Sequence, residues 1–227
     1  MDYRSIALDG PAGAGKSTLA KLAAKHFGFM YVDTGALYRC VGLYARRRGI
    51  ASKDTDGVSA LLPEIGLEMK YDENDVQRMI LNGKDVTDDI RSPEASVFAS
   101  DVSAMPAVRD FLLSMQREMA KKYDVIMDGR DIGTVVLPNA NVKVFLTADP
   151  AQRAKRRYAE FVEKSVDTTL DLVLSDMNMR DKNDSERAVA PLKAADDAIL
   201  LDTTHLDLDE SLAALCGIIE RSLAARE

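Results

Sequence analysis

Apolar and polar positions follow two different spacings along this chain, and each spacing predicts a different kind of element. Short apolar runs predict buried strands, whereas apolar residues three and four positions apart predict helices that bury one face. The predicted strands are residues 5–8, 29–32, 125–128, 142–146 and 198–202. The predicted helices are residues 16–27, 52–62, 93–103, 106–122 and 211–223. Another helix follows the segment 33–39, has Tyr38 and Arg39 in its first turns and ends at residue 48, and a further helix begins at residue 150. This alternation is typical of an α/β fold in which helices flank a parallel sheet, here of five strands.

One segment departs from that order. Residues 67–71 alternate between apolar and polar side chains, residues 76–81 do so less regularly, and Asn82-Gly83 precedes a short stretch at 84–87. Alternation around a turn dipeptide predicts antiparallel strands. We therefore expect a small antiparallel β insert, which either shapes a second ligand site or is a passive decoration of the surface.

The stretch between the first predicted strand and the first predicted helix has the most specific chemistry. It reads GPAGAGKS over residues 10–17 and fits the phosphate-loop spacing of P-loop NTPases at every defined position. Lys16 is expected to reach the outer phosphates of ATP, and the Ser17 hydroxyl to face Mg²⁺ or a water bound to it. The expected ATP-binding residues are Gly10, Pro11, Ala12, Gly13, Ala14, Gly15, Lys16, Ser17 and Thr18. The sequence thus predicts ATP and Mg²⁺ as the cofactors.

The composition narrows the class of partner. The chain has 227 residues, 46% of them hydrophobic, and a formal net charge of −7. That charge disfavours nucleic acid as a partner, and no apolar run approaches membrane-spanning length. Cys40 and Cys216 lie in apolar helical patterns, so we assign them no chemistry. We expect one cytoplasmic domain, a monomer, with no nucleic acid and no membrane as partners.

Charged side chains also follow two of the predicted strands. Arg39 lies in the helix after the second strand, and Asp128 ends the third strand, directly before Gly129-Arg130-Asp131. The carboxyl ends of parallel strands are where α/β sheets bind ligands. Arg109 lies in the first turn of its helix, where a cation is unfavourable for the helix dipole. These positions predict a second, arginine-lined cleft, with Asp128 near the magnesium ion.

Two later segments carry further arginines and predict a mobile lid over the phosphates. A polar, hinge-like segment at residues 165–169 separates them. The residues at helical spacing are Arg153, Arg156 and Arg157 in the first segment and Arg180, Asp184 and Arg187 in the second.

A donor site, an arginine-lined cleft and a lid together predict transfer of a phosphoryl group to an anionic acceptor. Guanidinium groups hold phosphate bidentately, and an acceptor phosphate needs no general base. The protein would align the two ligands, neutralise their repulsion and exclude water. A kinase that acts on a hydroxyl, with Asp33 or Asp128 as base, and a nucleotide-dependent switch are the alternatives. The surplus of acceptor-side arginines favours a phosphate acceptor.

Five stretches resemble the cytidylate kinases, the bacterial CMP/dCMP kinases within the nucleoside monophosphate kinase family. They are IALDGPAGAGKST at 6–18, DTGALYR at 33–39, PAVR at 106–109, DGRDIGTVV at 128–136 and RAVAPL at 187–192. The resemblance covers nearly the whole chain. It implies transfer of the γ-phosphoryl group of ATP to CMP or dCMP. The alternative is another P-loop small-molecule kinase, with UMP or a hydroxyl as acceptor.

The resemblance also implies a role for each matching residue. It implies Lys16, Arg130, Arg153 and Arg157 as catalytic residues, the last two from the lid. For the acceptor it implies that Arg39, Arg130 and Arg187 hold the CMP phosphate beside Tyr38, that Thr34, Arg180 and Asp184 approach the sugar, and that Ser100, Arg109 and Asp131 read the cytosine. A carboxylate beside a guanidinium complements cytosine, whereas uracil would place a carbonyl against Asp131. This chain departs from the family pattern at Thr34, where many members have serine, and at Glu186, where asparagine is common.

The expected organisation is a single kinase domain over residues 1–227. Its core comprises residues 1–33, 104–149 and 190–227. The monophosphate-binding part with the β insert comprises residues 34–103, and the lid comprises residues 150–189.

Overall fold

The structure is a computed structural model that describes residues 3–74, 76–163 and 165–226. Residues 1, 2, 75, 164 and 227, which belong to the predicted core, monophosphate-binding part and lid, lie outside the described residues. Within the described ranges, five parallel strands form one sheet in the order β2-β6-β1-β7-β8. They are β1 (Ser5–Asp9), β2 (Met30–Asp33), β6 (Val125–Gly129), β7 (Val142–Thr147) and β8 (Ile199–Asp202). The predicted parallel α/β fold is confirmed.

Successive residues of the central strand β1 face opposite sides of the sheet, as strand geometry requires. Ile6 and Leu8 are fully buried and pack in a hydrophobic cluster with α1 (Lys16–Phe27) and α8 (Leu208–Ala224). Ala7 belongs to a second buried cluster, against which α5 (Pro106–Ala120) and the π-helix η3 (Ile132–Val136) pack. Helices on both faces of the sheet therefore hold the strands in place, including the carboxyl ends near which the predicted site residues lie.

The predicted antiparallel insert is also confirmed. Its strands are β3 (Leu67–Tyr71), β4 (Gln77–Leu81) and β5 (Lys84–Asp85). They share a hydrophobic core with α2 (Thr34–Arg47), α3 (Thr55–Leu61), α4 (Pro93–Ser103) and α5, joined by 3-10 turns at Leu62–Glu64 and Asp89–Arg91. The Gln77 side chain accepts the Asp33 N–H at 2.8 Å, so the insert is fastened to the edge of β2.

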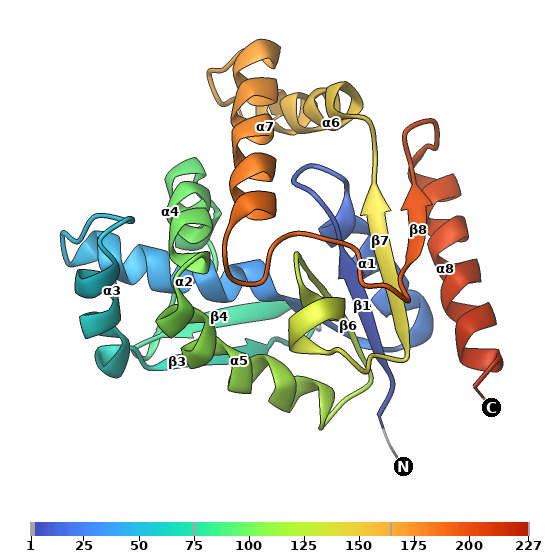
Figure 1. The fold of residues 1–227 in the computed structure, drawn as a ribbon, viewed down its shortest axis with the longest axis horizontal. Coiled ribbons are helices and arrows are strands. Elements are labelled where there is room, and N and C mark those ends of the chain that lie inside the picture. Colours follow the sequence, from blue (N-terminus) through green and yellow to red (C-terminus); the bar gives the residue numbers. More distant parts are fainter. Residues whose placement is uncertain (1–2, 75, 164, 227) are drawn as a thin grey trace.

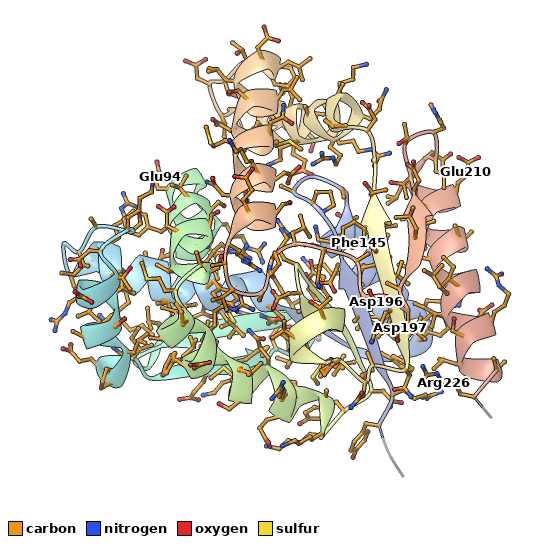
Figure 2. The ribbon with its side chains drawn as sticks, in the orientation of Figure 1. Glu94, Phe145, Asp196, Asp197, Glu210 and Arg226 are labelled. Atoms are coloured by element: carbon orange, nitrogen blue, oxygen red, sulfur yellow. The ribbon has the colours of Figure 1, made fainter. Side chains whose placement is uncertain are left out.

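Two helices, α6 (Pro150–Glu163) and α7 (Leu170–Glu186), stand beyond the carboxyl ends of the strands (Figure 1). They form the segment predicted to be the lid, and they share a small apolar core of their own. The chain then returns past β7 to β8, where Figure 2 shows Asp196 and Asp197. The buried Lys143 of β7 pairs with Asp197 at 2.8 Å, which fixes this return segment.

Three local features differ from the sequence-based expectation. The last helix begins at Leu208 rather than at Ser211, because Asp207 and Glu210 form a capping box. The π-helix after β6 was not expected. Arg187, placed at helical spacing from Arg180, lies beyond the end of α7 with φ −62° and ψ 139°. Across the described ranges, no helix combines the length and the apolar character needed to cross a lipid bilayer.

Candidate active site

The loop between β1 and α1 lies in close contact with the backbone of β7. A Cβ atom on Gly10 would lie 2.0 Å from the carbonyl oxygen of Leu146 in β7, so only glycine fits there. Gly13 and Gly15 have φ of 68° and 86°, in the left-handed region that glycine adopts without strain. Gly15 is the N-cap of α1, so the loop ends at a helix N-terminus, the usual place for an anion. All nine predicted ATP-binding residues lie on this loop and the first turn of α1.

Lys16 is buried, and its Nζ atom donates to the Pro11 carbonyl oxygen at 2.6 Å. Burial lowers the pKa of Lys16 well below its ordinary value, and the positive charges of Arg130 and Arg180 lower it further. A polyphosphate beside the ammonium group would raise the pKa of Lys16. The electrostatics around Lys16 therefore favour an anionic ligand.

Asp128, at the end of β6, faces the phosphate loop. One of its oxygens accepts from the Ser17 hydroxyl at 2.7 Å, and the other from the Tyr31 hydroxyl at 2.9 Å. Burial raises the pKa of Asp128, and the neighbouring Asp33 carboxylate raises it further. A hydroxyl beside a desolvated carboxyl group provides the hard oxygen donors that Mg²⁺ prefers. The residues present fit a magnesium ion bound together with a nucleotide.

Two of the arginines predicted to bind the acceptor are held by carboxylates. Arg39 of α2 lies 2.6 Å from Asp33, and Arg130, just after β6, lies 2.8 Å from Asp184 of α7. Although burial opposes it, the Arg39 guanidinium holds the pKa of Asp33 below its ordinary value. These pairs fix both guanidinium groups in place and join the core to α7.

Arg180 of α7 lies among the same cations. Its Nε atom is buried, and among the described residues it has no hydrogen-bond partner. Burial lowers the pKa of Arg180 to about 10, and the charges of Arg130, Arg39 and Arg157 act in the same direction. Like charges in a partly desolvated site are unfavourable unless an anion lies between them. The cluster is therefore suited to bind phosphate.

A second cluster joins three segments of the chain. Asp131 accepts from Arg109 of α5 through one oxygen and from Arg187 through the other, the latter at 3.1 Å. Ser103, at the end of α4, accepts from both guanidinium groups at 3.2 Å, through its carbonyl for Arg109 and its hydroxyl for Arg187. Burial raises the pKa of Asp131, although the two arginines oppose this. The structure thus brings together three of the residues predicted to bind CMP.

The remaining predicted acceptor residues surround these clusters. The buried Thr34 hydroxyl donates to the Asp128 carbonyl oxygen at 2.8 Å. Tyr38 is buried, and the Arg109 guanidinium lies 5.8 Å from its ring centroid. Ser100 lines a groove of about 440 Å³ between the end of α4 and the end of α7. A larger hollow, of about 840 Å³, lies between β2 and the insert, and Arg39 is one of the residues that line it.

The three arginines of α6 have different surroundings. Arg153 is buried and donates to the Ala12 carbonyl oxygen of the phosphate loop at 2.8 Å. Arg156 donates to the carbonyl oxygen of Thr203 after β8 at 2.6 Å. Arg157 is more exposed and pairs with Glu160 of its own helix at 2.6 Å. The structure therefore places Arg153 at the tip of the loop and leaves Arg157 near the cation cluster that includes Arg180.

Sequence reasoning did not identify Asp9 as part of the site. Its carboxylate accepts the N–H groups of Ile132 and Gly133 at 2.8 and 2.7 Å, directly after Asp131. Burial raises the pKa of Asp9 to about 6. An acidic residue at the end of an apolar strand was the available signal, because a buried carboxylate needs partners.

Ser103, Tyr31 and Asp181 were also missed. Ser103 contacts both guanidinium groups of the Asp131 cluster, Tyr31 donates to Asp128, and Asp181 accepts the Ala12 N–H at 2.9 Å. Apart from the contact between Ser103 and Arg109, which are six positions apart, these contacts join segments that are distant in the sequence. The sequence pattern around the three residues carries no comparable signal.

The protein-family model described as cytidylate kinase matches residues 6–221, a range that contains all five stretches that carry the resemblance. The chain belongs to the cytidylate kinase family. A cytidylate kinase of Lactobacillus johnsonii is 47% identical over 216 residues, which cover 95% of this chain and 94% of that protein. A cytidylate kinase of Lactiplantibacillus plantarum is 48% identical with the same coverage.

Among solved structures, an uncharacterized protein from Eubacterium ventriosum aligns with a TM-score of 0.50 and 15% identity. The alignment covers 96% of this chain and 98% of that one. At that level of identity the likeness concerns the fold alone, and it agrees with the parallel sheet and flanking helices described above.

Proposed function

We propose that this chain transfers the γ-phosphoryl group of ATP to the phosphate of CMP or dCMP, giving ADP and CDP or dCDP. Membership of the cytidylate kinase family supports this reaction. The observation that carries it is the group of cations formed by Lys16, Arg39, Arg130 and Arg180 at the carboxyl ends of the strands. Two ligands that carry phosphate groups approach each other only if such charges offset their repulsion.

In the proposed complex, ATP binds along residues 10–18, with its outer phosphates at Lys16. Arg39, Arg130 and Arg187 hold the CMP phosphate, and Thr34, Arg180 and Asp184 lie near its sugar. A phosphate oxygen of CMP attacks the γ-phosphorus, and the bond to the oxygen that bridges the β- and γ-phosphates breaks as ADP leaves. The attacking oxygen is already anionic, so the chain has to align the ligands and exclude water rather than remove a proton.

Lid arginines would complete the site. Arg157 is the lid arginine with the more exposed side chain, and its charge already acts on Arg180. We propose that it moves onto the transferring phosphoryl group when both ligands bind, where one such contact can change the rate by orders of magnitude. Arg153, held at the loop tip, would keep the loop in place beneath that group.

The base-reading proposal rests on the second cluster. Asp131, Arg109 and Ser100 would face the cytosine, with the Asp131 carboxylate accepting from the exocyclic amino group and Arg109 donating to the ring acceptors. Uracil presents a carbonyl where cytosine presents that amino group, so UMP would meet the carboxylate unfavourably. CMP is therefore the expected pyrimidine acceptor.

Magnesium would be held by Ser17, directly or through water, with Asp128 hydrogen-bonded beside it. In the described ranges, no group of three or more His, Cys, Asp or Glu side chains could hold a metal ion by itself. Magnesium commonly takes most of its ligands from water and substrate phosphates. When bound with ATP, it would neutralise charge on the β- and γ-phosphates.

The hydroxyl-acceptor alternative has no support from the geometry. It requires a base near the acceptor hydroxyl, for which Asp33 and Asp128 are the candidates. Asp33 accepts from Arg39 and from the Ala36 N–H, and Asp128 accepts from two hydroxyl groups. These hydrogen bonds do not decide between the alternatives, and the surplus of arginines around the acceptor site is what favours a phosphate acceptor.

A coupled assay of ADP formation with CMP, dCMP, UMP or AMP tests the proposal. The expected result is rapid turnover with CMP and dCMP and slower turnover with UMP. Equal or faster turnover with UMP would contradict the base-reading proposal. ADP formation that does not depend on any acceptor would favour the nucleotide switch instead.

A further inference from the structure

Asp181 of α7 joins the lid to the tip of the phosphate loop. One carboxylate oxygen accepts the Ala12 N–H at 2.9 Å, and the other accepts from Arg153 Nη1 at 2.5 Å. The same Arg153 nitrogen donates to the Ala12 carbonyl oxygen at 2.8 Å. Both polar backbone groups of Ala12 are therefore bonded to side chains of the α6–α7 pair.

The packing around this contact is close. Ala12 is only 7% exposed. A Cβ atom on Gly13 would lie 2.6 Å from the Met177 side chain and 3.3 Å from the Arg153 backbone oxygen. Met177 and Asp181 are four residues apart, so they lie on the same face of α7. Figure 1 shows α7 standing beside the loop that follows β1.

The charge of Asp181 has a specific partner. The Arg153 side chain is 6% exposed, and its Nε atom donates to the Ala148 carbonyl oxygen at 2.9 Å. Asp181 supplies the carboxylate that offsets this buried guanidinium. Removing one member of a buried pair leaves the other charge uncompensated. Without Asp181, Arg153 would lose the partner that holds it against Ala12.

We propose that Asp181 is a positioning residue that fastens the lid to the phosphate loop through Ala12 and Arg153, so that lid closure sets the shape of the ATP site. This inference rests on the proposed function, because it assigns the fastening a part in phosphoryl transfer. The contacts are made to the phosphate loop and share no residue with the Asp131 cluster. Loss of Asp181 therefore affects the use of ATP more than the use of CMP.

The test compares Asp181→Asn and Asp181→Glu with Asp176→Asn, the same change at an exposed position of α7. Asp181→Asn removes the charge, and we expect the KM for ATP to rise about tenfold while the KM for CMP stays within about twofold. Asp181→Glu keeps the charge and restores part of the loss. Asp176→Asn matches the unaltered chain.

A second readout does not depend on activity. The Ala12 amide proton is donated to Asp181, so its hydrogen exchange, followed by NMR, should become about tenfold faster in Asp181→Asn. Amides in the buried strand β1 report whether the variant is folded. If Asp181→Asn does not fold, the same measurements on Asp181→Glu and Arg153→Lys replace it, with intermediate effects expected.

The outcomes separate the two proposals. Unchanged KM for ATP and unchanged Ala12 exchange in a folded Asp181→Asn would overturn the positioning role. If the unaltered chain binds ATP but does not phosphorylate CMP, the proposed function fails. Faster Ala12 exchange in the variant would then still support the fastening of the loop.

Discussion

Replacing Asp131 with alanine tests the proposed recognition of cytosine. The side chain is 6% exposed and accepts from Arg109 and Arg187. In the proposed complex it also accepts from the cytosine amino group. A hydrogen bond to a charged group contributes about 1.5–3 kcal/mol, so we expect kcat/KM for CMP to fall about 10- to 100-fold more than kcat/KM for UMP.

The same substitution should destabilise the fold. It leaves two buried guanidinium groups without their carboxylate, which costs about 3–5 kcal/mol. Urea unfolding measures this loss, and the kinetic assay is run below the unfolding transition. Asp110→Ala, at an exposed position next to Arg109, is the matched control. It should leave the free energy of unfolding and the ratio of CMP to UMP turnover unchanged. If Asp131→Ala keeps the wild-type ratio of CMP to UMP turnover, the reasoning is wrong.

Three further predictions concern the donor side. Burial raises the pKa of Asp9 from 3.8 to about 6. Protonated Asp9 therefore stabilises the fold fully below about pH 4, and the free energy of unfolding falls by about 3 kcal/mol as the pH rises through 6. Asp9→Asn stays neutral, so its unfolding free energy relative to wild type should rise by up to about 3 kcal/mol from pH 4 to 7 in urea titrations; a constant difference would refute this. Gly13→Ala should lower the free energy of unfolding by about 1 kcal/mol, because alanine is strained in the left-handed conformation, and should raise the KM for ATP. Adding Met177→Ala should lower that KM again in part, because it removes the side-chain atom that lies 2.6 Å from the new Cβ. Ser17→Ala should raise the Mg²⁺ concentration for half-maximal activity about tenfold, and an unchanged Mg²⁺ dependence would argue against Ser17 as a ligand.

Most of the fold could be predicted because its signals are local. The periodicity of residues 16–27 and the stop at Gly28 predict α1 as it is found. The alternation at 67–71 and the Asn82-Gly83 turn predict the antiparallel insert. The start of α8 was placed three residues late, because apolar spacing marks the buried face of a helix while the capping box marks its first turn.

The candidate site was only partly accessible from sequence. Gly10 to Thr18 form one local motif, so their place in the fold could be predicted. The contact between Asp181 and Ala12 joins residues 169 positions apart, and no local pattern encodes it. Arg153 donates to the Ala12 carbonyl oxygen at the loop tip, and its predicted place near the transferring phosphate stays a prediction. The monomeric state, the cytoplasmic location and the division into core, monophosphate-binding part and lid stay predictions.

Phosphorus NMR of the purified protein with ATP, Mg²⁺ and either CMP or cytidine tests the central claim most directly. The arginine cluster is proposed to bind an acceptor that already carries a phosphate. We therefore predict one CDP formed for each ADP in the CMP sample, and no CMP formed in the cytidine sample. Phosphorylation of cytidine at a comparable rate, or CMP left unchanged by protein that binds ATP, would contradict the account.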